Sequence, residues 1–122
     1  MKSCMYRIYE FVEEATTGIE NAQQVISSQE ELVEVLGEAK TKNDFSEFIA
    51  GAKENIEGIK KQIDTITIKS TLSKEIISLY EAGKAENASE EAKSTSALVD
   101  TIVTNLLVSL GVCSIEEVNE GN

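Results

Sequence analysis

Apolar residues recur along the first third of the chain at alternating spacings of four and three residues. Such spacing is typical of a helix that buries one face against another helix. The positions are Ile8, Val12, Ala15, Ile19, Ala22, Ile26, Val33 and Leu36, with the polar Gln29 filling one place in the pattern. The pattern predicts a long first helix over about residues 5–39, ended by Gly37 and the polar residues 40–43.

Beside this stripe runs a second row of residues, formed by Phe11, Gly18, Val25 and Leu32. The row widens the apolar face beyond a single seam, so we expect the first helix to contact two neighbours. Gln29 has two interpretations of equal weight. It is either a buried amide that fixes register and partner choice, or a side chain at the edge of the seam that reaches solvent.

The same spacing predicts a second helix over about residues 44–82, with Asn43 or Asp44 as its N-cap. Its stripe consists of Phe45, Ile49, Ala52, Ile56, Ile59, Ile63 and Ile66. Continuing the stripe would place Ser70 and Ser73 in the core, whereas the apolar residues occur at Ile68, Leu72, Ile76 and Leu79. We therefore predict a shift of register with a bend near residues 67–71. A strand is the less favoured alternative, because the segment contains no Gly or Pro.

The last third predicts a helix over about residues 89–110, closed by Gly111 and apolar almost all round from Ile102 to Leu110. Such a helix is either central in the fold or part of an interface. Ser114 and Glu117 have the spacing of a capping box, which predicts a short helix over 114–119. The predicted fold is all-α and forms a single domain over residues 1–122. It is a long antiparallel helical hairpin with a shorter third helix packed on it, as in a coiled-coil-like three-helix bundle.

The two cysteines, Cys4 and Cys113, fall at distant points of this predicted bundle. A straight third helix would rise about 33 Å and leave the thiols on the order of 30 Å apart. A disulfide needs Cα atoms within about 7 Å of each other. We therefore expect both thiols to be unpaired within one chain. Two cysteines are also too few for a disulfide scaffold, which favours a reducing compartment, and we expect a cytoplasmic location, with a virion-associated one as the alternative.

Composition excludes several classes of function. The chain has 22 acidic and 11 basic residues and a formal charge of −11, which repels nucleic-acid phosphates. It has no histidine, the commonest acid–base residue and the commonest metal ligand. We therefore expect no enzyme activity, cofactor, metal or small-molecule substrate. The most apolar window, residues 97–113, is shorter than the ~20 residues that cross a bilayer, so we expect no membrane contact.

Charge is unevenly distributed between the two long helices. Residues 8–39 contain eight acids and no base, whereas residues 44–84 contain seven acids and six lysines. A helix of one sign suits docking to a basic protein surface, or it serves only solubility. The candidate partner-binding residues are this acidic set and two leucines of the third helix: Glu10, Glu13, Glu14, Glu20, Glu31, Glu34, Glu38, Leu107 and Leu110.

These patterns favour a non-enzymatic helical protein that acts through its surfaces, with a protein partner, as a homo-oligomer, or both. We interpret it as a structural or assembly subunit, and composition points to a bacteriophage or other bacterial machine. The alternative is a small acidic inhibitor or adaptor, such as a phage-encoded antagonist of bacterial defence, that docks on a basic surface. Docking through acids would weaken steeply with ionic strength, whereas assembly through apolar stripes would not.

Overall fold

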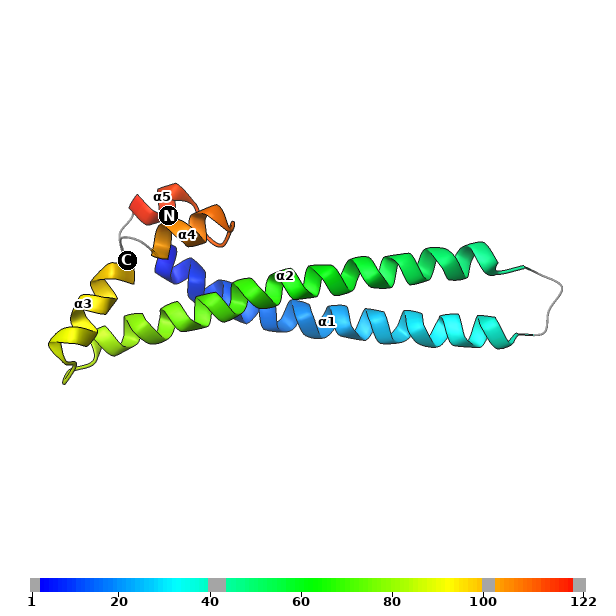
Figure 1. Ribbon diagram of the computed structural model, residues 1–122, viewed down its shortest axis with the longest axis horizontal. Helices are drawn as coiled ribbons and strands as arrows, with labels where there is room; N and C mark the ends of the chain where they lie inside the picture. The colour runs from blue at the N-terminus through cyan, green and yellow to red at the C-terminus, as the bar shows by residue number, and fades with distance from the viewer. Residues whose placement is uncertain (1–2, 40–43, 100–102, 120–122) are drawn as a thin grey trace. The chain divides into compact units, whose positions relative to one another are not determined.

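The computed structural model describes residues 3–39, 44–99 and 103–119, and these are almost entirely helical (Figure 1). The helices in chain order are α1 (Cys4–Glu38), α2 (Ser46–Lys84), α3 (Glu90–Leu98), α4 (Thr104–Ser109) and α5 (Ile115–Asn119). No strand occurs among the described residues. The prediction of an all-α fold is confirmed. The predicted core position Ile102 and the predicted cap Asn43 lie outside the described residues.

The chain divides into two compact units rather than the single domain expected over residues 1–122. Residues 16–67 form one unit, here called the hairpin unit. Residues 1–15 and 68–122 form the other, here called the terminal unit. Both long helices therefore contribute one segment to each unit.

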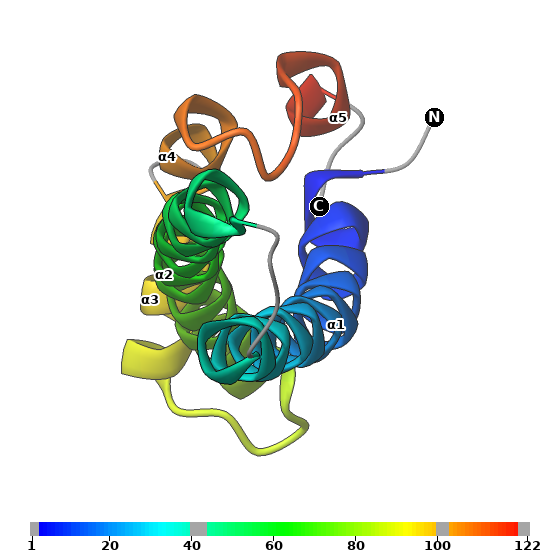
Figure 2. The ribbon, with the colours of Figure 1, turned by 90° about the vertical axis from the view of Figure 1, so that its right-hand side faces the viewer.

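In the hairpin unit, the C-terminal part of α1 lies side by side with the N-terminal part of α2 (Figures 1 and 2). The predicted stripes face inward, since their residues in this unit are all buried or half-buried. Ile26 and Ile56 are the buried residues among the described part of the unit. Gln29 is half-buried and accepts a hydrogen bond from Asn55 at 3.1 Å, so this amide pairs α1 with α2 inside one chain.

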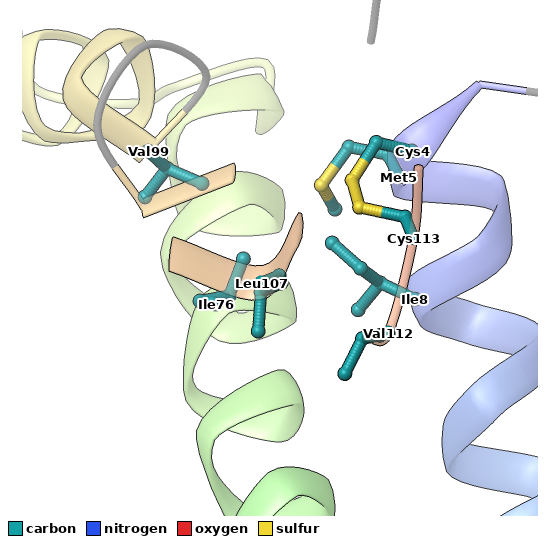
Figure 3. Packing of buried hydrophobic residues seen from close by; sticks show 8 residues of the cluster. All are labelled: Cys4, Met5, Ile8, Ile76, Val99, Leu107, Val112 and Cys113. Carbon is teal, nitrogen blue, oxygen red and sulfur yellow. A yellow bond between two sulfur atoms is a disulfide. The ribbon is translucent and has the colours of Figure 1, made fainter. Parts of the chain in front are cut away.

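The terminal unit holds the main hydrophobic core (Figure 3). Three segments meet there. Residues Cys4, Met5 and Ile8 come from α1, and Ile76 comes from α2. The C-terminal segment supplies Val99, Leu107, Val112 and Cys113. This core joins the two ends of the chain, because residues from the first and last turns pack against each other.

The predicted shift of register in α2 is correct only in part, since Ile76 is buried and Leu72 packs against the core as predicted. Ser73 is fully buried and Ser70 nearly so, whereas Ile68 is 67% exposed. The stripe thus continues through both serines, and α2 is helical without interruption across residues 67–71. Ser73 tolerates burial because its hydroxyl donates to the carbonyl of Lys69 at 2.8 Å.

The predicted third helix is divided. α3 ends at Leu98 and α4 begins at Thr104, and the backbone at Val99 and Val103 has the wider turns of a π-helix. The buried Thr104 hydroxyl donates to the carbonyl of Val99 five residues earlier, at 2.9 Å.

A glycine turn then sends the chain back towards the N-terminus. Gly111 has a positive φ of 79°, which favours glycine. The Val112 amide donates to the Leu107 carbonyl and the Gly111 amide to the Val108 carbonyl, both at 3.0 Å. These are the two bonds of a Schellman motif, and its apolar contact is supplied by the buried Leu107 and Val112.

This turn places Cys113 beside Cys4, and the two form a disulfide with a Cα–Cα distance of 5.4 Å. The expectation of two unpaired thiols on the order of 30 Å apart is therefore wrong. It failed because it assumed one straight helix from residue 89 to 110. The turn at Gly111 instead directs the chain back to Cys4.

The capping box before α5 is confirmed. The Ser114 amide donates to the Glu117 carboxylate at 2.7 Å, and the Glu117 amide donates to the Ser114 hydroxyl at 3.2 Å. At the start of α2, Asp44 accepts from the amide and the hydroxyl of Ser46. The side-chain bond, followed by the backbone bond, lowers the pKa of Asp44 below its ordinary value.

Candidate functional site

Among the described residues, neither a free thiol nor a cluster of potential metal ligands is found. Cys4 and Cys113 are both consumed by the disulfide, so neither is a free thiol that could act as a nucleophile. No cluster of three or more potential ligands of the His, Cys, Asp or Glu type occurs in the described ranges. None of the helices found there is long and apolar enough to cross a membrane.

Among the predicted acidic residues, Glu10 differs from the rest because it is half-buried and paired. Its carboxylate accepts from the Arg7 guanidinium at 2.6 Å. Arg7 also lies 3.6 Å from Glu117, which links α1 to α5. The hydrogen bond to Glu10 raises the pKa of Arg7 against a smaller opposing effect of burial, and the nearby acids add to the rise. Glu10 thus orients Arg7, whose guanidinium links α1 to α5 within the terminal unit.

The other predicted acids are exposed and lie along α1. They are Glu13, Glu14, Glu20, Glu31, Glu34 and Glu38. The structure brings them together only as residues of one helix. They remain available for an electrostatic contact, with Glu14 3.9 Å from Arg7.

The two leucines predicted to bind a partner do not form a surface patch. Leu107 is fully buried in the core of the terminal unit, so it is not exposed at the surface of the single chain. Leu110 is half-buried and packs against the same core. The apolar character of this segment is explained by its central place in the unit, which is one of the two alternatives that the sequence left open.

Tyr9 of α1 donates a hydrogen bond to Glu81 of α2 at 2.7 Å. Burial first, and then the bond to Glu81, raise the pKa of Tyr9 to about 12 from 10.0. Both effects favour the neutral phenol in the folded state. The contribution to stability is therefore complete below pH 10 and is lost as the pH rises from 10 towards 12.

We expect the difference in unfolding free energy between the protein and Tyr9→Phe to shrink across this pH range. The loss is about 1 kcal/mol or less, because Tyr9 is 39% exposed and solvent screens the interaction. Urea unfolding at several pH values, with parallel measurement of phenolate absorbance, checks this. An identical pH dependence in the two proteins would contradict the role of Tyr9.

The hairpin unit has a charged side. It is formed by residues at helical spacing on both helices, and its charged members are Glu20, Glu30, Glu34, Lys53, Glu57, Lys60 and Asp64. Glu30 and Glu34 of α1 line a shallow depression with Lys53 and Lys60 of α2. Opposite charges therefore face each other across the hairpin on this side, which favours the observed pairing.

On the other side of the hairpin unit the exposed residues at helical spacing are uncharged, and Lys61 lies beside Gln62 and Thr65 at one end of this side. We call this side the charge-free face. Leu32 of α1 lies on it with Phe48, Gly51 and Asn55 of α2, since these residues line one depression. Helical spacing extends the set, and every member is exposed: Gly18, Asn21, Val25, Ser28, Leu32, Val35, Phe48, Gly51, Asn55, Gly58, Gln62 and Thr65.

The sequence indicated part of this face. The row that includes Gly18, Val25 and Leu32 predicted a second neighbour for the first helix. Phe11 of that row packs on the core of the terminal unit, whereas Val25 and Leu32 are exposed. The contribution of α2 was missed, because Phe48 joins the row only when the two helices are aligned.

No family model matches the chain, and the searches of curated proteins and of solved structures also found no match.

Proposed function

We propose that the protein is a non-enzymatic helical interaction protein, a structural or assembly subunit that docks through its hairpin unit. One observation carries the proposal. Val25, Leu32, Val35 and Phe48 are large apolar residues that are all more than 40% exposed. Ile26 and Ile56 are by contrast the only buried residues in the described part of this unit. A thin core beside exposed apolar side chains is typical of a surface that a partner covers.

The setting we propose is a bacteriophage or other bacterial assembly. The disulfide supports a virion-associated location over a cytoplasmic one. Disulfides persist on virion and cell surfaces and are rare in the reducing cytosol. A crosslink between the two ends of the chain also suits a subunit that must endure outside the cell.

The alternative is an acidic inhibitor or adaptor that docks on a basic protein surface. The observation that favours it is the exposure of acids along α1, with no base between residues 8 and 39. Glu31 and Glu38 lie on the outer surface of that helix. Such a complex would dissociate as ionic strength rises, whereas docking through the apolar residues would persist.

Site-specific photo-crosslinking in the cells that make the protein separates the two candidates. A photoreactive phenylalanine analogue replaces Phe48 on the charge-free face, Ala50 on the charged side, or Glu31 on the outer acidic surface. We expect protein adducts from position 48 and none from position 50. Adducts from position 31 alone would favour the acidic adaptor. Absence of adducts at all three positions would contradict both candidates.

A further inference from the structure

We propose that the charge-free face binds a second copy of this chain, so that two hairpin units pack face to face as a four-helix arm. The inference rests on the proposed function, because it names the partner of the same surface. It is carried by three features of the hairpin unit: its charge distribution, its shape and its area.

Charge distribution favours a second copy. Each chain carries a formal charge of −11, so two copies repel each other at long range. The outer surface of α1, with Glu31 and Glu38, would set acid against acid in a symmetric contact. The charge-free face avoids this penalty because it meets itself without like charges. A basic partner, by contrast, would find no acid to bind on this face.

The shape of the face is suited to a symmetric contact. Gly18, Gly51 and Gly58 are open, since a methyl group added at any of them would meet no other atom within 4 Å. They form low points beside the exposed side chains of Val25 and Phe48. In a twofold dimer the same face of each copy forms the contact. Protruding side chains of one copy can then lie over the glycines of the other.

The area of the face is close to what a specific dimer needs. From Gly18 to Val35, α1 rises about 26 Å, and two adjacent helices are roughly 20 Å wide. The contact thus covers roughly 500 Å² on each copy, or about 1,000 Å² in total, which is the lower limit for a biological interface. We therefore expect a reversible dimer with a dissociation constant on the order of 10 μM.

Two adjacent serines of α1 provide a matched test. Ser28 lies on the charge-free face, whereas Ser27 lines a depression on the charged side, and both are exposed. Ser28→Glu and Ser27→Glu make the same chemical change one residue apart. Sedimentation equilibrium of the full oxidised chain, at about 1–100 μM, gives the dissociation constant of each variant. Circular dichroism confirms that both are folded.

We expect a monomer–dimer equilibrium in the unmodified protein. Ser28→Glu should raise the dissociation constant at least about tenfold, because two buried carboxylates would face the partner, while Ser27→Glu should change it less than about threefold. A monomer at all concentrations, or equal effects of the two variants, would overturn the inference. If the protein is monomeric yet position 48 crosslinks to a different protein in cells, the proposed function stands and the second-copy inference fails.

Discussion

Reduction of the Cys4–Cys113 disulfide is expected to lower the free energy of unfolding by about 4 kcal/mol. The bond joins residues 109 apart in sequence, so it removes a large amount of chain entropy from the unfolded state. Chain-entropy estimates give roughly 4–5 kcal/mol for a loop near 100 residues, and removal of native disulfides costs about 2–5 kcal/mol. The effect should be concentrated in the terminal unit, whose core contains both sulfur atoms.

Thermal unfolding followed by circular dichroism, with and without a reductant, measures this effect. For a chain of this size the melting temperature should fall by about 10–20 °C. The double variant Cys4→Ala/Cys113→Ala is the control, because the reductant should have no effect on it. Peptide mapping of the unreduced protein should recover Cys4 and Cys113 in one crosslinked pair. Alkylation of both thiols in the native, unreduced protein would refute the bond.

The disulfide could not be predicted from the sequence, because it depends on two tertiary features. α3 ends at Leu98 and α4 begins at Thr104, and the sequence between them has no Gly or Pro that marks these helix ends. Gly111 was identifiable as a helix end, but the direction of the chain after it is set by the burial of Leu107 and Val112. Local patterns give the positions of helix ends far better than they give the path of the chain between helices.

The long helices and the capping box were predictable, since each is a local pattern. The stripe through Ile8 and Ile26, and the reciprocal bonds of Ser114 and Glu117, follow from spacing alone. The burial of Ser70 and Ser73 was not predicted, because the core stripe was defined by large apolar residues alone. A small hydroxyl residue that bonds its own helix backbone can occupy a core position as well.

The candidate surface was only half predictable for a similar reason. One row on α1 is visible as a row of small and apolar residues in the sequence, and it includes Val25 and Leu32. The matching row on α2 consists mainly of Gly, Asn, Gln and Thr, which read as ordinary solvent-facing residues. These residues matter because none of them is charged. They form one surface with the row on α1 only when the two helices are aligned, and the hydrogen bond from Asn55 to Gln29 fixes that alignment.

Substitution Gly83→Ala is expected to destabilise the terminal unit by about 2 kcal/mol, although Ala is the better helix former. Gly83 lies in the last turn of α2, where α3 crosses it closely. A methyl group there would overlap the Cβ of the buried Ser96 and lie 3.0 Å from the carbonyl oxygen of Ala92. Both obstacles belong to α3, so the two helices would have to separate. The Ser96 hydroxyl, 3.4 Å from the carbonyl of Tyr80, would lose its contact.

Gly58→Ala is the matched control, because it makes the same change in the interior of the same helix. A methyl group at Gly58 meets nothing within 4 Å, so the substitution should stabilise the monomer by roughly 0.5–1 kcal/mol. Urea unfolding at sub-micromolar concentration compares the two without a contribution from self-association. Adding Ser96→Gly to Gly83→Ala should recover part of the loss, since it removes the overlapping atoms. Equal stabilities of the Gly83→Ala and Gly58→Ala proteins would show that α2 and α3 do not cross at Gly83.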